Sequence, residues 1–296
     1  MNICLISPAF YPLIGGGETH VRTLASGLTR LGHHVVVVTN LYDSSLSQCE
    51  IIDGVEVLRT YSYLKYINAP GRVPWEECLF GLLRDIEEFL AGRTIDIIHA
   101  HCQASAILGA MIKTQWRCPL LITFHETQPE LEPFGTSRSH MLYSHLPYEQ
   151  IIATSHFFQE QALHFGADSR RVRLIYHGVD VDRFSPEQSG THIRARLGVN
   201  ADQPLVLLAG RFKERKGILE FVRAMAEVSH RYPKARGLIT GGYNSASLEY
   251  AERVRSEIEQ LRLAHIITFQ QEPFPWEDMP ALFACADLII QPSYTE

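Results

Sequence analysis

The chain of 296 residues contains no Cys-x-x-Cys pair. Its cysteines are scattered, so the sequence predicts neither a structural zinc site nor a disulfide framework. A reducing compartment, the cytoplasm, fits this use of cysteine. The cysteines are Cys4, Cys49, Cys78, Cys102, Cys118 and Cys285.

Long apolar segments are also missing. The runs at 35–38 and 286–290 are far shorter than the roughly 20 residues that a transmembrane helix needs. The N-terminus lacks the charged start of a signal peptide, so we expect a cytoplasmic protein without a membrane span. The aromatic and histidine-rich segment Met141–Phe165 leaves open a peripheral contact at the cytoplasmic face of a membrane, although ordinary core packing is the simpler interpretation.

The chain has no excess of positive charge, and its formal net charge is −6. Residues 1–187 carry 14 basic and 20 acidic side chains, and residues 188–296 carry 13 of each. Neither part has the basic balance that is typical of nucleic-acid binding, so nucleic acid is not expected as a partner.

Apolar runs of strand length alternate with segments of helical periodicity. This alternation predicts βαβ units and parallel sheets, an α/β fold whose ligands gather at the carboxyl ends of the strands. The expected helices include Glu18–Leu31, Trp75–Leu90, Thr191–Leu197 and Ile218–Tyr232. The expected strands are Asn2–Ser7, Val35–Thr39, Val55–Thr60, Ile95–Ala100, Leu120–Phe124, Ile151–Thr154, Arg173–Ile175, Leu205–Ala209, Gly237–Thr240, Ile266–Phe269 and Leu288–Gln291.

A polar stretch, Phe184–Pro204, interrupts the alternation. A chain of this length favours two α/β domains over one. We therefore expect one domain at residues 1–187 and a second at residues 188–296.

A basic turn lies between Gly210 and Gly217, after one expected strand and before a helix. The free N–H groups and the dipole at the start of a helix favour an anion. Arg211 and Lys216 would add a guanidinium fork and a point charge, which suit a diphosphate. The alternative is a solvated charged turn.

A glycine loop, Gly15 to Gly17, follows the first expected strand and ends at a helix start. Glycines there allow a ligand to approach the backbone closely. A dinucleotide fingerprint would require glycine at position 20, where the chain has His20, so that alternative is weak. A plain flexible turn stays open.

Histidines mark two further strand ends. His125 and Glu126 follow the strand at 120–124, and a histidine there can orient a sugar hydroxyl or a phosphate. His99 and His101 point to the same face of their strand, and for this pair a hydrogen bond to a nearby carbonyl is the favoured interpretation. Ser155 is first of all a helix N-cap candidate.

These features occur in a fixed order together with His177-Gly-Val-Asp180 and the final segment, Ala286 to Glu296, which contains Pro292-Ser-x-x-Glu296. The set resembles glycosyltransferase family 4 of the GT-B fold along the whole chain. The resemblance implies two facing Rossmann-like domains, with the acceptor mainly on the first domain and a nucleotide-sugar donor mainly on the second.

The resemblance also implies roles for individual residues. His125, Arg211, Lys216 and Glu296 would be the catalytic set, with the two cations on the donor diphosphate, His125 at the transferred sugar and Glu296 at its hydroxyls. The donor site would include Gly15, Gly16, Gly17, Gly241 and Ser293, and the acceptor side Glu18, His101 and Glu126. Family members transfer with retention and without an obligatory metal or other cofactor, so no metal ligand and no nucleophile are assigned, and Glu126 is open to being only a surface carboxylate.

The chain departs from the family pattern in three places. His177 stands where asparagine is common, and Gly241-Gly-Tyr-Asn244 replaces a typical Gly-x-Gly-Pro, which puts base recognition near Gly241 in doubt. The sequence ends at Glu296, before the family's second glutamate, which binds the donor ribose. We therefore expect an incomplete second domain, either in a fragment or in a natural truncation.

The expected activity is transfer of a hexose from a UDP- or GDP-sugar to a lipid, glycan or small-molecule acceptor bearing a hydroxyl. One alternative is a nucleotide-sugar epimerase of the same architecture, and another is a non-catalytic donor-binding subunit. Asp180-x-Asp182 matches the metal motif of the GT-A class, but it lies at the linker and arises easily by chance.

Overall fold

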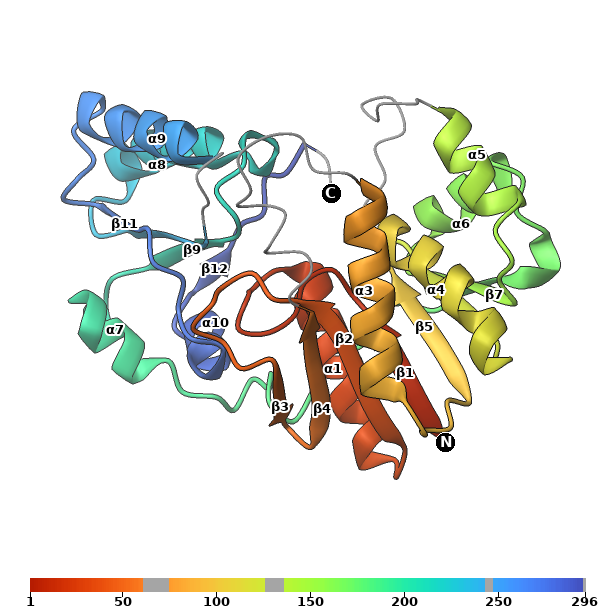
Figure 1. Cartoon of the computed structure of the whole chain (residues 1–296). Coiled ribbons are helices and arrows are strands. Elements are labelled where there is room, and N and C mark those ends of the chain that lie inside the picture. Colours follow the sequence, from red (N-terminus) through yellow and green to blue (C-terminus); the bar gives the residue numbers. More distant parts are fainter. Residues whose placement is uncertain (61–74, 126–135, 243–246, 295–296) are drawn as a thin grey trace. The chain divides into compact units, whose positions relative to one another are not determined.

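The computed structural model describes residues 1–60, 75–125, 136–242 and 247–294. The chain forms two compact units, Met1–Val179 and Asp180–Glu296. Each unit contains its own sheet, and the carboxyl ends of the parallel strands in each sheet meet at one edge (Figure 1).

The first unit is built on an eight-stranded sheet with the order β3-β4-β2-β1-β5-β6-β7-β8. Neighbouring strands run parallel except for β3, which is antiparallel to β4. The strands are β1 (Asn2–Ile6), β2 (His34–Asn40), β3 (Cys49–Ile52), β4 (Val55–Thr60), β5 (Ile97–His101), β6 (Leu120–Thr123), β7 (Gln150–Ala153) and β8 (Val172–Leu174).

Helices cover both faces of this sheet (Figure 1), because its strands present apolar side chains on both faces. Ile3 and Leu5 of β1 pack with Val21 and Ala25 of α1. Cys4 of β1 packs in the opposite core with side chains of α3 and α4. The helices are α1 (Gly16–Arg30), α3 (Trp75–Leu90), α4 (Gln103–Trp116), α5 (Thr136–Ser144) and α6 (His156–His164), with a 3-10 turn η2 (Ser169–Arg171) before β8.

The second unit contains a four-stranded parallel sheet with the order β11-β10-β9-β12. Helices α8 and α9 lie side by side on one face (Figure 1), and α7 and α10 pack on the other. The elements are α7 (Thr191–Leu197), β9 (Leu205–Ala209), η3 (Glu214–Lys216), α8 (Ile218–Arg231), β10 (Arg236–Thr240), α9 (Leu248–Gln260), β11 (Ile267–Gln270), η5 (Trp276–Asp278), α10 (Met279–Ala284) and β12 (Leu288–Ile289).

The predicted α/β alternation is confirmed, and each expected strand has a counterpart. Strand β3 was not predicted; it forms a hairpin with β4 through Asp53 and Gly54. Both turn residues have positive φ, 52° and 80°, as a two-residue hairpin turn requires. The Asp-Gly pair was the available signal.

The segment Met141–Phe165 packs only partly in the core of the first unit. Leu142, Tyr143 and Phe165 are buried there, as the core-packing interpretation predicts, whereas Met141, Phe157 and Leu163 are exposed. Among the described residues, no helix is long and apolar enough to cross a membrane.

Gly190 provides a test of the packing of the second unit. It precedes α7, and a Cβ atom at this position would lie 2.2 Å from the backbone N and Cα of Cys285. Because both partners are backbone, neither can move aside, and we expect Gly190→Ala to lower the free energy of unfolding by about 3 kcal/mol. Urea denaturation measures this change.

Gly27 in α1 is the control, because a Cβ atom there meets nothing within 4 Å. Gly27→Ala should leave stability unchanged or raise it by up to about 1 kcal/mol, since alanine favours the helix. Equal effects of the two substitutions would contradict the packing described for Gly190.

Candidate functional site

Each sheet has one point where the strand order reverses. In the first unit this switch point lies between β1 and β5, and in the second it lies between β9 and β12. The loops that follow such a strand pair diverge, so ligands of open α/β sheets bind there. The predicted site residues follow these strands and their neighbours.

The glycine loop leads into α1, the helix that follows β1 after the loop at 7–15. Gly15 is the N-cap residue and accepts a hydrogen bond from the N–H of Thr19 at 2.9 Å. A Cβ atom on Gly17 would lie 3.9 Å from the ring of His125. The buried Arg59 holds the preceding loop, because its guanidinium donates to the carbonyl of Tyr11 at 2.8 Å and pairs with Glu50. The fold thus brings the predicted glycine loop next to the predicted histidine.

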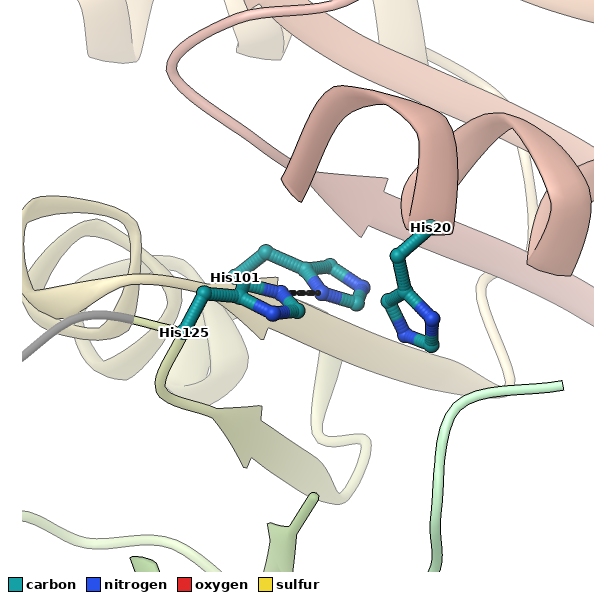
Figure 2. A group of neighbouring side chains, drawn as sticks. All are labelled: His20, His101 and His125. Atoms are coloured by element: carbon teal, nitrogen blue, oxygen red, sulfur yellow. Dashed lines mark hydrogen bonds between the residues drawn. The ribbon is translucent and has the colours of Figure 1, made fainter. Parts of the chain in front are cut away.

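Histidines from different elements gather at this edge of the first sheet (Figure 2). His20 lies on α1, His101 ends β5 and His125 follows β6. A ring nitrogen of each lies within 4.8 Å of one on each of the other two, and His101 Nδ1 and His125 Nε2 form a hydrogen bond of 3.0 Å. We call His20, His101 and His125 the histidine cluster.

Two further histidines border the histidine cluster. The ring of His177 lies 4.0 Å from that of His20 and 5.4 Å from that of His125, between ring centroids. The ring of His99 lies 4.2 Å from that of His101, and its Nε2 bonds Thr123 Oγ1 at 2.8 Å. The replacement of the family's asparagine by His177 thus adds an imidazole at this site.

Burial keeps these imidazoles neutral. Desolvation, together with the neighbouring His177 and His125, lowers the pKa of His20 from 6.5 to about 3. Desolvation and the rings of His177 and His99 lower the pKa of His125 to about 4. His101 is 1% exposed, and its pKa lies well below the usual value for the same reason. At neutral pH each ring therefore offers one lone pair and one N–H.

The sequence interpretation of His99 and His101 was correct on their shared face but wrong on their partners. Each bonds a side chain, Thr123 or His125, where a carbonyl was expected. His20 was not predicted as a site residue. Its position, one turn into the helix after the glycines, was the only local signal.

The basic turn in the second unit is anchored by Phe212. This side chain is fully buried and packs against Phe269 with ring centroids 5.1 Å apart. Arg211 precedes the anchor and is exposed, whereas Lys216 ends η3 and is half-buried. Gly217 then starts α8 with a φ of 67°. The predicted strand, basic turn and helix are therefore present.

The segment after β12 lies against this turn. The N–H of Tyr294 donates to the carbonyl of Arg215 at 2.8 Å, and Gln291 Nε2 donates to the carbonyl of Ala209 at 2.6 Å. A Cβ atom on Gly217 would lie 2.2 Å from the carbonyl oxygen of Pro292, so only glycine fits. Ser293 Oγ is buried and has no hydrogen-bond partner among the described residues.

Gly241 also belongs to this side of the second sheet. A Cβ atom there would lie 1.8 Å from the carbonyl oxygen of Gly210, and the N–H of Phe212 donates to the carbonyl of Gly242 at 3.1 Å. The fold therefore brings together the predicted donor residues Arg211, Lys216, Gly241 and Ser293.

The remaining predicted positions lie elsewhere. Glu18 is in the first turn of α1, and Ser155 caps α6 by accepting from the N–H of Phe158 at 3.3 Å, as predicted. Glu126 and Glu296 lie outside the described residues. Asp180 and Asp182 belong to no group of three or more potential metal ligands in the described part of the chain, whereas the histidine cluster does form such a group.

Each unit has one sheet with one switch point. The glycine loop lies at the switch point of the first sheet and the basic turn at that of the second, an arrangement that matches a GT-B glycosyltransferase. Glycosyltransferase Family 4 matches residues 14–183, and Glycosyl transferases group 1 matches residues 190–296. The first match covers more than half of the chain, which therefore belongs to glycosyltransferase family 4.

Relatives of known sequence agree with this assignment. An uncharacterized glycosyltransferase of Methanocaldococcus jannaschii is 27% identical over 100% of this chain and 75% of its own length. A D-inositol 3-phosphate glycosyltransferase of Nocardioides is 25% identical over 95% of this chain and 66% of its own length. The chain thus spans three quarters of the length of the first relative and just under two thirds of the length of the second.

Solved structures share the fold. Sucrose-phosphate synthase from Thermosynechococcus elongatus matches 100% of this chain and 76% of its own, with a TM-score of 0.79 and 24% identity. The Anabaena protein HepE, solved in complex with UDP and glucose, matches 100% of this chain and 75% of its own, with a TM-score of 0.75 and 21% identity.

The neutral histidines predict an acid-sensitive fold. Burial lowers the pKa of His99 from 6.5 to about 3 in the folded chain. Below pH 6.5, His99 is therefore protonated in the unfolded chain but stays neutral in the folded chain. The free energy of unfolding consequently falls as the pH falls. Each such group gives a slope of up to about 1.4 kcal/mol per pH unit.

His99→Gln removes one of these groups. In chelator-treated buffer, the free energy of unfolding of this variant should fall less steeply between pH 7 and pH 5, by about 1 kcal/mol per pH unit. Urea denaturation at several pH values measures how the free energy of unfolding changes with pH. This dependence can be compared between the two proteins even if the variant is less stable at pH 7. The same slope in the variant and the natural protein would contradict a neutral, buried His99.

Proposed function

We propose that this protein transfers a hexose from a UDP- or GDP-sugar to a lipid, glycan or small-molecule hydroxyl, with retention of configuration. The observation that carries the proposal is the basic turn at the switch point of the second sheet, with the segment after β12 held against it. Residues 188–296 would bind the donor and residues 1–187 the acceptor, in the cytoplasm.

The chemistry explains why cations are needed at this turn. Breaking the bond between the sugar and the diphosphate places negative charge on the leaving phosphate. Fixed cations aimed at that charge lower the barrier most effectively. Arg211 would hold two phosphate oxygens at once and Lys216 would add a point charge, so no step of the transfer needs a metal ion.

The neighbouring groups suit the sugar. Ser293 Oγ, buried without a partner among the described residues, would bond a sugar or phosphate oxygen, and Glu296 would accept from sugar hydroxyls. Gly15, Gly16 and Gly17 would let the backbone of α1 approach the reacting groups. Glu18, His101 and Glu126 would line the acceptor side.

The neutral state of His125 fits the reacting sugar. The sugar gains positive charge as its bond to the phosphate breaks, and a charged imidazolium would oppose that change. Because its lowered pKa keeps His125 neutral, the ring would donate a hydrogen bond to a sugar hydroxyl without this penalty. The leaving phosphate itself would assist the acceptor on the same face, so no protein nucleophile is required.

One structural neighbour and one sequence relative support the proposed substrates. HepE, the structural neighbour, is in complex with UDP and glucose, and the Nocardioides relative carries the name of an inositol 3-phosphate glycosyltransferase. These names favour a uridine nucleotide sugar as the first donor to test and a polyol phosphate as one of the first acceptors.

Arg211→Ala and Lys216→Ala test the diphosphate assignment. Each should lower kcat/KM for sugar transfer at least tenfold, or about 1.4 kcal/mol, because each removes a cation that acts on the leaving phosphate. The assay measures nucleoside diphosphate release and product formation by the full-length protein with a panel of UDP- and GDP-sugars.

The control is Arg255→Ala, which removes an exposed cation from α9 and should leave the rate unchanged. Unchanged turnover in both Arg211→Ala and Lys216→Ala would contradict the assignment of these residues to the donor diphosphate. Conversion of the sugar nucleotide without an acceptor would identify an epimerase, and donor binding without turnover would identify a binding subunit.

A further inference from the structure

The histidine cluster carries an inference beyond sugar transfer. His20, His101 and His125 each place a ring nitrogen within 4.8 Å of the other two. In a tetrahedral zinc site, with zinc to nitrogen distances of about 2.0–2.1 Å, ligand nitrogens lie roughly 3.4 Å apart. The 3.0 Å contact between His101 Nδ1 and His125 Nε2 is a hydrogen bond, so zinc binding would require His125 to turn its Nε2 lone pair from His101 towards the ion.

An unsatisfied atom points to a missing partner. His101 Nε2 is buried and has no hydrogen-bond partner among the described residues, although a buried polar atom left alone costs about 1–3 kcal/mol. The centroids of the three rings lie 5.1–5.6 Å from one another, and Figure 2 shows them grouped, with the His101–His125 hydrogen bond drawn. A cation bound through His101 Nε2 would supply the partner that this atom lacks.

We propose that His20, His101 and His125 form a binding site for one zinc ion. Imidazole nitrogens suit zinc and related first-row metals, and three histidines leave the fourth position of a tetrahedral ion open. The sequence concealed this site because its ligands come from α1, β5 and the residue after β6. None of them shows the short spacing of a metal motif.

The consequence of binding rests on the proposed function. The histidine cluster lies beside the glycine loop, where the acceptor and the reacting sugar are proposed to bind. A zinc ion there would take the lone pairs of His101 and His125 and occupy space beside Gly17. Because transfer itself needs no metal, zinc would act as a reversible inhibitor.

Zinc titration of the metal-stripped full chain tests the site. Competition with a chromophoric chelator should show one tightly bound zinc ion per chain. His20→Gln and His125→Gln should each weaken zinc binding at least tenfold. The control His192→Gln, at an exposed position of α7, should leave it unchanged. Cobalt should give the intense visible absorption of a tetrahedral ion in the natural chain and lose it in both cluster variants.

The controls separate loss of ligands from loss of fold. Circular dichroism establishes that each variant is folded, and the half-buried His20 can be changed alone if His125→Gln unfolds. Zinc affinity and stoichiometry that are the same in the natural chain and in folded His20→Gln would overturn the proposal. So would the absence of tight zinc binding to the natural chain.

Inhibition is measured separately. Micromolar zinc should suppress sugar transfer and EDTA should restore it, whereas EDTA alone should not abolish transfer. If no sugar transfer is found under any condition, the proposed function fails while the titration still decides on the zinc site. Zinc binding that leaves an active enzyme fully active would overturn the inhibitory role.

Discussion

Parallel strand pairing is the constraint on which both sites depend. β1 pairs with β5 and β9 with β12, each in parallel register, so the loops after these strands leave the sheet at the same edge. The glycine loop and His101 meet at one switch point, and the basic turn and the segment after β12 meet at the other. The segments that meet at each switch point are far apart in sequence, and the strand register brings them together.

The two switch points differ in their electrostatics, and the difference follows from burial. In the first unit, burial desolvates the imidazoles and their neighbouring histidines add repulsion, so their pKa values lie below the usual value. In the second unit, Arg211 stays exposed to water, and Phe212 fixes the turn through the core without burying that charge. Neutral hydrogen-bonding groups suit a sugar, and exposed cations suit a diphosphate.

Much of this arrangement could be predicted from the sequence because it is local. Strand length, helical period and glycine position predicted β1, β9, α1 and α8, and with them the glycine loop and the basic turn. The cap at Ser155 was equally local. By contrast, the one local signal of His20 is its position a turn after the glycines, and this signal is weak because a histidine on an amphipathic helix is ordinary.

The contacts that the sequence concealed are long-range. The hydrogen bond between His101 and His125 depends on the register of β5 against β6. The contact of Gly217 with Pro292 depends on the pairing of β9 with β12. Hairpin β3–β4 was missed for another reason: its outer strand is short and partly exposed, with little apolar alternation.

The most direct measurement of the central claim is an amide NMR titration of the labelled chain with UDP-glucose and with GDP-sugars. The account predicts that the largest shifts for the bound donor fall on Gly210 to Gly217 and on Gln291 to Ser293, whose backbones meet at the switch point of the second sheet. Shifts confined to the first unit, with the basic turn unaffected at saturation, would contradict it.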